Sequence, residues 1–293
     1  MTIRPRRSIL YMPGSNARAI EKAKTLPADG VILDLEDAVA PEAKAAARKQ
    51  VTEAAKGGGF GTREVFIRVN GIETEWHADD MHAAAHAGPD GIVVPKVASA
   101  EQLEMIGRRL LDMSTALKTR VWAMIETPVA VLNVQEIAAA AADSETRLAG
   151  LILGTNDLAK ETGAKFVPGR APMTAWLSTC VLGARAAGIF ILDGVYNDLS
   201  NAEGFLRECE QGRDFGFDGK TLIHPNQIGP CNEVFSPDVE EIAQARKIIA
   251  AFDQPENKGK GVVSLDGRMV ERMHADMARR TVAIAEAIEA KGG

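Results

Sequence analysis

Two carboxylates that follow apolar runs are the residues of this chain best suited to chemistry. Glu126 ends the run VWAMIE, and Asp157 ends the segment AGLILGTND. Such runs are typical of buried strands in a parallel sheet, and ligands bind at the carboxyl ends of those strands. Buried carboxylates are costly unless a cation lies between them. Because neither motif contains His or Cys, we predict a site for a hard divalent ion, Mg²⁺ or Mn²⁺, held by oxygen atoms.

Both acids also have a purely structural interpretation. Each could form a salt bridge, and Asp157 could cap a helix that begins in the sequence NDLAKE. We favour the metal site, since acids at the carboxyl ends of neighbouring strands converge on one pocket.

Further charged residues follow other apolar runs. Arg68 ends the strand-like part of VFIRVN, where a guanidinium suits bidentate binding of a substrate carboxylate; the alternative is a structural ion pair. Glu36 and Asp37 in DLEDAVAP could cap the next helix or orient waters around the metal. Asp37 is therefore a candidate catalytic residue. Arg7 belongs to a basic cluster near the first apolar run, which is either a solvated face or a contact for a phosphate-bearing ligand.

Composition narrows the classes of protein to consider. A net charge of −6 disfavours a nucleic-acid partner, which would require a surplus of Lys and Arg. The three cysteines are scattered without CxxC spacing, as expected for reduced thiols in the cytoplasm and not for disulfides or a zinc site. No long apolar stretch follows the basic N-terminus, so we expect neither a signal peptide nor a membrane anchor.

The elements that must position these residues recur at even intervals. Eight apolar runs alternate with alanine-rich stretches of helical periodicity, such as residues 41–56 and 174–188. This alternation predicts an α/β fold, a (β/α)₈ TIM barrel over residues 1–235. A doubly wound sheet is the alternative, but MPGSN lacks the G-x-G-x-x-G turn typical of that fold. The eight runs are SILYMP, DGVILDLE, EVFIRVN, DGIVVPKV, RVWAMIE, AGLILGTND, GIFILDG and GFDGKTLIHP.

Residues 236–293 form an extension beyond the predicted barrel. A helix is predicted over residues 237–252, followed by the polar linker DQPENKGKG and then a strand-turn signal and a long helix. We expect the part after the linker to be too small for a core of its own. It would therefore pack on the barrel mouth or on a neighbouring subunit.

Several ordered motifs together resemble one enzyme family. RSILYMPGSN, GVILDLEDAV, VFIRVNG, IVVPKV, MIETP, GTNDL and GKTLIHPNQI occur in the order found in the HpcH/HpaI aldolase and citrate lyase beta-subunit family. The chain looks most similar to the branch of malyl-CoA lyase, citramalyl-CoA lyase and citryl-CoA lyase-like proteins. The resemblance covers nearly the whole chain.

The resemblance implies a TIM barrel, a divalent metal (usually Mg²⁺) and a CoA-thioester substrate. It places the metal on Glu126 and Asp157, and it places Arg68 at the 2-oxo acid or its carboxylate. It also places Arg7 and Lys96 in the region that receives CoA. Family members form homotrimers or hexamers, in which the C-terminal segment of one subunit covers the active site of its neighbour.

The metal-ligand segment is also expected to line the substrate site. The residues concerned are Gly154, Thr155 and Asn156, together with Asp157 and Glu126.

The tail departs from the family pattern at one position. Where the family has a catalytic aspartate followed within two residues by proline, the sequence GRMVERM has Glu271 and Met273. An added methylene lengthens the reach of the acid by more than ~1 Å, enough to affect rate. We keep Glu271 as the candidate acid/base residue at the thioester end, with Asp266 as a substitute.

The expected activity is therefore Mg²⁺-dependent carbon–carbon lysis of a 3-hydroxyacyl-CoA that bears a carboxylate. A malyl-CoA, citramalyl-CoA or citryl-CoA type of substrate would yield acetyl-CoA or an analogue and a 2-oxo acid. Hydrolysis of the thioester, as in malyl-CoA thioesterases, is the first alternative. A non-catalytic protein that binds a CoA ligand is the second. Aldolases acting on free acids rank below these.

Overall fold

The computed structural model describes residues 4–291, which divide into two compact units. The larger unit spans residues 6–232. The smaller unit consists of the chain from residue 233 onward together with residues 4 and 5. Within residues 4–291, no helix combines the length and the apolar character that a membrane crossing requires.

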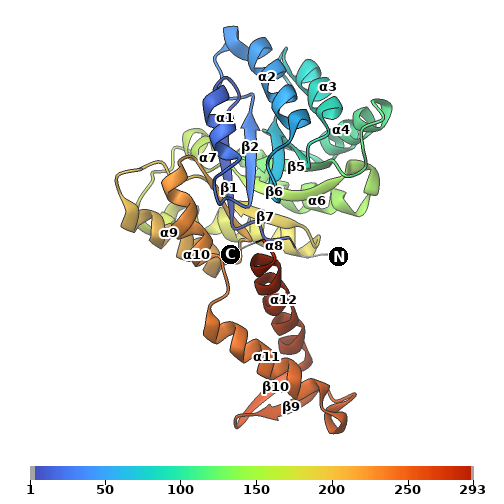
Figure 1. Ribbon diagram of the computed structural model, residues 1–293, viewed down its shortest axis with the longest axis vertical. Coiled ribbons are helices and arrows are strands. Elements are labelled where there is room, and N and C mark those ends of the chain that lie inside the picture. Colours follow the sequence, from blue (N-terminus) through green and yellow to red (C-terminus); the bar gives the residue numbers. More distant parts are fainter. Residues whose placement is uncertain (1–3, 292–293) are drawn as a thin grey trace. The chain divides into compact units, whose positions relative to one another are not determined.

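The larger unit is a closed barrel of eight parallel strands in sequential order, and the predicted TIM barrel is confirmed (Figure 1). Each strand coincides with one of the eight apolar runs. The strands are β1 (Ser8–Pro13), β2 (Gly30–Asp34), β3 (Glu64–Arg68), β4 (Gly91–Val94), β5 (Arg120–Ile125), β6 (Leu148–Leu153), β7 (Phe190–Asp193) and β8 (Gly219–Leu222).

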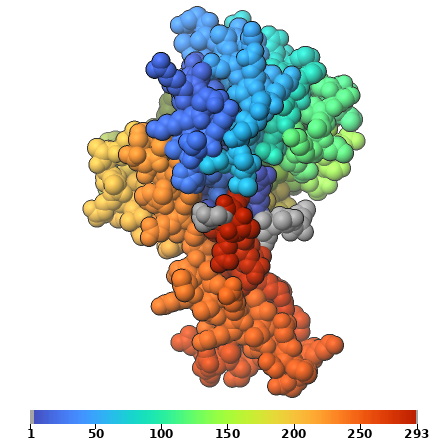
Figure 2. Space-filling model, in the orientation of Figure 1, coloured from blue at the N-terminus to red at the C-terminus, as the bar shows by residue number. Residues whose placement is uncertain are grey.

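Helices connect the strands and lie around the barrel (Figure 1), and the residues from α1 to α4 form the blue to green surface in Figure 2. They are α1 (Ala17–Ala23), α2 (Lys44–Gly57), α3 (His77–Ala87), α4 (Ala100–Asp112), α5 (Pro128–Leu132), α6 (Val134–Ala139), α7 (Thr155–Thr162), α8 (Thr174–Ala186), α9 (Ala202–Phe215) and α10 (Ile228–Val234). The 3-10 turns are η1 (Pro41–Ala43), η2 (Ala140–Ala142), η3 (Ser144–Thr146), η4 (Pro168–Met173) and η5 (Pro225–Gln227).

Proline and glycine set the limits of several helices. Pro41 opens the turn η1 that leads into α2, and Pro128 opens α5 behind the N-cap Thr127. Proline suits these first-turn positions because its missing N–H has no partner there in any case. Gly163 ends α7 with a φ of +72°, a conformation that glycine adopts without steric cost.

The barrel interior is filled by apolar side chains from alternate positions of the strands. They are Ile9, Ile32, Phe66, Val93, Trp122, Met124, Ile152 and Leu192, with Tyr11, Ala149 and Phe190 packed against them. Side chains alternate between the two faces of a strand, so the next inward positions after Ile32, Phe66 and Met124 are charged residues. Three charged side chains, Asp34, Arg68 and Glu126, thus close the core at the carboxyl ends of the strands.

The C-terminal unit is a helical pair with a small hairpin. It contains α11 (Val239–Asp253), η6 (Pro255–Asn257), β9 (Val262–Leu265), β10 (Arg268–Glu271) and α12 (Arg272–Glu289). The hairpin turns at Asp266 and Gly267, both with positive φ, as a tight two-residue turn requires. The helix predicted over residues 237–252 is observed as α11.

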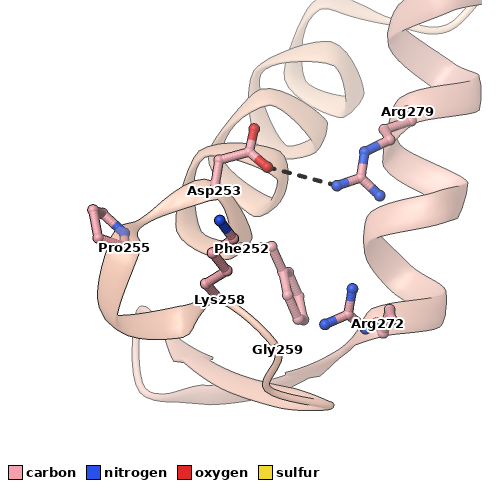
Figure 3. Close-up of a pocket in the computed structure, with 7 residues that line it drawn as sticks. All are labelled: Phe252, Asp253, Pro255, Lys258, Gly259, Arg272 and Arg279. Atoms are coloured by element: carbon pink, nitrogen blue, oxygen red, sulfur yellow. Dashed lines mark ion pairs between the residues drawn. The ribbon is translucent and has the colours of Figure 1, made fainter.

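The part of the chain after the linker, which was expected to be too small for a core of its own, packs on the preceding helix α11. Phe252 from α11 is buried against Val263, Val270 and Ala275 of the hairpin and α12. The long preceding helix supplies the aromatic residue that the tail alone would lack. Figure 3 shows a cavity of about 440 Å³ in this unit, beside the ion pair in which Arg279 of α12 lies 3.7 Å from Asp253 of α11.

Candidate active site at the carboxyl ends of the strands

Arg68, the last residue of β3, forms a bidentate pair with Asp34, the last residue of β2. Its Nε and Nη2 atoms donate to Oδ1 and Oδ2 of Asp34, each at 2.7 Å. Burial alone would lower the pKa of Arg68, but the carboxylate of Asp34 raises it well above its usual range. Burial likewise works to raise the pKa of Asp34, and Arg68 reverses that effect and lowers it. The two residues therefore remain charged and hold each other in place at the bottom of the site.

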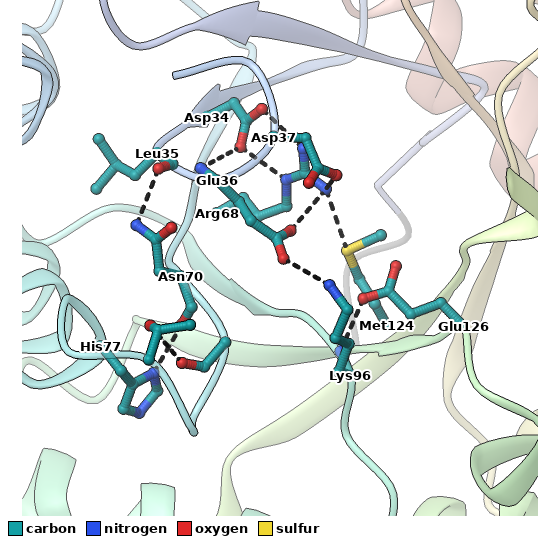
Figure 4. A network of polar contacts seen from close by, with 12 residues as sticks. Asp34, Leu35, Glu36, Asp37, Arg68, Asn70, His77, Lys96, Met124 and Glu126 are labelled. Atoms are coloured by element: carbon teal, nitrogen blue, oxygen red, sulfur yellow. Dashed lines mark hydrogen bonds and ion pairs between the residues drawn. The ribbon is translucent and has the colours of Figure 1, made fainter. Parts of the chain in front are cut away.

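The third guanidinium nitrogen of Arg68 faces the loop after β2 (Figure 4). Its Nη1 lies 2.9 Å from Oε2 of Glu36 and 3.3 Å from Oδ2 of Asp37. Glu36 is buried, whereas the side chain of Asp37 is 65% exposed and can meet solvent or a ligand. Burial raises the pKa of Glu36 despite the opposing charges of Arg68 and Lys96. The structure thus brings the predicted residues Arg68, Glu36 and Asp37 together.

Lys96 links two of the carboxylates through different atoms. Its backbone N–H donates to Oε1 of Glu126 at 2.8 Å, and its ammonium donates to Oε1 of Glu36 at 3.0 Å. Lys96 adopts a left-handed backbone with a φ of +54°. That conformation costs a non-glycine residue roughly 1 kcal/mol or more and is characteristic of functional sites.

Glu126 follows β5 and is almost fully buried, at 1% exposure. Burial and the negative charges of Glu36 and Asp157 raise the pKa of Glu126 to about 8, against the opposing effects of Arg68 and Lys96. A side chain at position 154 would overlap Cβ and Oε2 of Glu126, so the glycine there is required by close approach.

Asp157 lies in the first turn of α7, which starts directly after Gly154. It is half-buried and close enough to Glu126 for their charges to interact. Of the other residues in this segment, Thr155 is buried, and Asn156 is exposed and exchanges side-chain amide hydrogen bonds with Asn197.

These donors fit a hard divalent cation. Within residues 4–291, no group of three or more Asp, Glu, His or Cys residues has the arrangement of a complete metal site. Mg²⁺ does not need one, because it keeps several waters and binds through one or two carboxylates. Oε2 of Glu36 is buried and, in the described part of the chain, has the ion pair with Nη1 of Arg68 at 2.9 Å but no hydrogen bond. Glu126 and Asp157 bear like charges that a cation would neutralise.

One predicted residue lies at the other end of the barrel, and another belongs to the C-terminal unit. Arg7 precedes β1, at the end of the barrel opposite the carboxylates, and its Nε donates to buried Asp29 at 2.9 Å. The prediction that Arg7 receives CoA is not supported by this position, because its guanidinium already holds a structural pair. Glu271 belongs to the C-terminal unit, where it is exposed and forms the N-cap of α12 in a capping box with His274.

Sequence reasoning missed three residues that shape the site. Asp34 was detectable as a lone charge in the apolar run VILDL, in the inward register of Ile32. Tyr11 was detectable in the same way on β1, two residues after Ile9. Lys44 carried no signal: its buried ammonium donates to the carbonyls of Leu35 and Glu36 at 2.8 and 2.7 Å and so holds the loop that carries Glu36.

The chain is similar to several known proteins. The family model described as HpcH/HpaI aldolase/citrate lyase matches residues 7–225. A (3S)-malyl-CoA thioesterase of Cereibacter sphaeroides is 49% identical over 98% of this chain and 96% of its own. The citrate lyase subunit beta of Escherichia coli is 34% identical over 97% and 94%, respectively.

Solved structures share the fold. The protein CitE from Mycobacterium tuberculosis, in complex with magnesium, acetoacetate and coenzyme A, has a TM-score of 0.75 and 29% sequence identity. The match covers 96% of this chain and 98% of that one.

Proposed function

The chain belongs to the HpcH/HpaI aldolase/citrate lyase family, and we propose that it hydrolyses the thioester of a carboxylate-bearing 3-hydroxyacyl-CoA of the malyl-CoA type. This choice reverses the order expected from the sequence, in which carbon–carbon lysis came first. Four relatives that are 47–49% identical over 98% of the chain are named (3S)-malyl-CoA thioesterase, whereas the citrate lyase subunits are 34% identical.

One observation carries the proposal: Arg68, Lys96 and the carboxylates Glu36, Asp37 and Glu126 converge at one end of the barrel. Carboxylates and cations together suit a substrate with its own carboxylate and a reaction in which charge develops on oxygen. Glu126 and Asp157 would hold Mg²⁺, as the magnesium complex of the CitE relative supports. When bound, the ion would supply positive charge that polarises an oxygen of the substrate.

The chain's own residues would divide the remaining work. Nη1 of Arg68 is not used by Asp34. It contacts Glu36 and the exposed Asp37, and the free carboxylate of the substrate would replace its 3.3 Å contact with Asp37. Asp37 is the exposed carboxylate beside it and would accept a proton from the attacking water. The water oxygen then bonds to the thioester carbonyl carbon, the carbon–sulfur bond breaks, and the proton held by Asp37 passes to the leaving thiolate to give free CoA. Lys96, with a 44% exposed side chain, would bind the CoA portion through its ammonium.

Glu271 would act at the thioester end, supplied by a neighbouring subunit of a homotrimer or hexamer. It is exposed at the start of α12, and two exposed methionines, Met269 (74%) and Met273 (58%), flank it. Exposed apolar side chains of this kind suit contact with another protein surface. Mixing inactive Glu126→Gln and Glu271→Gln proteins would test this, since roughly a quarter of randomly mixed sites would regain both acids. If no activity returns, the proposal that two subunits contribute to one active site is wrong.

Product analysis tests the reaction itself. The protein is incubated with Mg²⁺ and malyl-CoA in ¹⁸O-water, and the products are identified by mass spectrometry. Free CoA and malate with ¹⁸O in the released carboxylate would support hydrolysis. Acetyl-CoA and glyoxylate would instead support the lyase, which the citrate lyase relatives and the acetoacetate and CoA complex favour. Binding without turnover of any hydroxyacyl-CoA would favour a non-catalytic protein.

A further inference from the structure

Tyr11 lies in the floor of the candidate site. It is on β1, packs against the interior cluster that contains Ile9 and Met124, and faces the barrel interior. The guanidinium carbon of Arg68 lies 4.8 Å from the centre of its ring. The aromatic ring therefore supports the guanidinium that the proposed function assigns to the substrate carboxylate.

The hydroxyl of Tyr11 lacks a good hydrogen-bond acceptor. Within residues 4–291, its single acceptor is Sδ of Met124 at 3.9 Å. A thioether is a weak acceptor, and hydroxyl donors normally approach oxygen to about 2.7–2.8 Å. Tyr11 is half-buried, and in the described chain its hydroxyl has only a thioether beside it, so this O–H is available to a ligand.

Charged groups of the site surround this hydroxyl. Burial, aided by the charges of Asp34, Glu126 and Glu36, raises the pKa of Tyr11 well above its usual range, although Arg68 opposes the shift. The hydroxyl therefore keeps its proton at neutral pH and remains a donor. A neutral donor beside a guanidinium complements an anionic oxygen and adds no charge of its own.

We propose that Tyr11 is a substrate-binding residue whose hydroxyl donates a hydrogen bond to an oxygen of the hydroxy-acid or oxo-acid end of the substrate. This inference rests on the proposed function. It assigns to the barrel interior a contact that recognises the short acid and not the CoA portion.

Fluorine NMR provides a direct test, because the chain contains only two tyrosines, Tyr11 and Tyr196. Protein labelled with 3-fluorotyrosine should give two resonances, assigned with the variant Tyr196→Phe. Oxaloacetate or malate added with Mg²⁺ should shift the Tyr11 resonance beyond any shift from Mg²⁺ alone. If the acid leaves that resonance in place while it binds, the inference is overturned.

Substitution separates a binding role from a structural one. Tyr11→Phe keeps the ring beneath Arg68 and removes only the hydroxyl. A hydrogen bond to a charged oxygen contributes enough that its loss should weaken acid binding about tenfold or more. For malyl-CoA hydrolysis KM should rise with kcat little changed, because the acid end is bound equally before and during the reaction. Tyr196→Phe, whose ring packs on Phe205, is the matched control and should behave as wild type.

The outcomes also separate this inference from the proposed function. If the wild type binds the acids and Tyr11→Phe binds them equally well, Tyr11 has no such role and the proposed function stands. If the wild type binds no short hydroxy or oxo acid and hydrolyses no thioester, the proposed function fails and the role of Tyr11 fails with it. A Tyr11→Phe protein with a normal melting temperature but weaker acid binding would support both.

Discussion

The backbone N–H of Lys96 donates to Oε1 of Glu126 at 2.8 Å from a left-handed conformation. This one residue fixes the buried carboxylate through its main chain and Glu36 through its ammonium. The two contributions can be separated by substitution, because glycine adopts the same backbone conformation without strain and has no side chain.

Lys96→Gly should be about 1 kcal/mol more stable than Lys96→Ala, because alanine is strained at a φ of +54°. Both variants should lose turnover of acyl-CoA, since neither has the ammonium. Urea denaturation and thioester hydrolysis assays measure the two effects. Ser114, which also has a positive φ of +51°, is the control: Ser114→Gly and Ser114→Ala should differ in stability alone. Equal stability of Lys96→Gly and Lys96→Ala would show that the left-handed backbone at position 96 is not strained.

Glu126→Gln should make the metal-free protein more stable above pH 8 while abolishing stabilisation by Mg²⁺. The pKa of Glu126 is raised to about 8, above its unfolded value, so wild-type stability falls as pH rises from about 4.5 to about 8. A neutral amide avoids that cost, which for such a pKa change is of the order of several kcal/mol, so the melting temperature should rise by roughly 4 °C or more. Scanning calorimetry with and without Mg²⁺ checks both effects, and the surface change Glu104→Gln on α4 is the control. A variant that Mg²⁺ still stabilises would exclude Glu126 as a ligand.

Mg²⁺ affinity should rise with pH and level off near pH 8. Binding requires the ionised carboxylate of Glu126, so below its pKa of about 8 each pH unit should strengthen binding about tenfold. Titration calorimetry at pH 6, 7, 8 and 9 measures this dependence. If the affinity for Mg²⁺ stays constant from pH 6 to pH 9, ionisation of Glu126 does not control metal binding.

Asp34→Asn should destabilise the protein by about 3–5 kcal/mol at pH 7, because it leaves Arg68 buried without its bidentate partner. The pKa of Asp34 is lowered in the folded state, so its contribution is complete above its unfolded value near 4 and is lost as pH falls below it. The difference in unfolding free energy between wild type and Asp34→Asn should therefore be smaller at pH 3 than at pH 7. Asp79→Asn, which removes an exposed carboxylate paired with Arg48, should cost about 0–1 kcal/mol at either pH. If the difference in unfolding free energy between wild type and Asp34→Asn is the same at pH 3 and pH 7, the ionised carboxylate of Asp34 does not stabilise Arg68.

The barrel was predictable because each strand is an apolar run bounded by turn residues, as in RVWAMI before Glu126. The convergence of strand-end charges followed from parallel strands alone. Pairings within the site were not predictable in this way. Arg68 was recognised, but its partner Asp34 depends on which face each strand turns inward. Lys96 is neither Gly nor Asn, so nothing in PKV marked its left-handed backbone. Arg7 was expected where CoA binds, but a basic cluster in the sequence does not show at which end of the barrel its side chains lie.

Gly154 limits how this enzyme can change. Any substituent there would collide with Glu126, so mutational drift towards new acyl groups cannot reshape the pocket from the loop after β6. In a laboratory selection for bulkier substrates, adaptive changes should instead accumulate around Tyr11 and the loop that carries Asp37. Glycine should be retained at position 154 in every selected variant that remains active. A substitution there should occur only in variants that have lost activity.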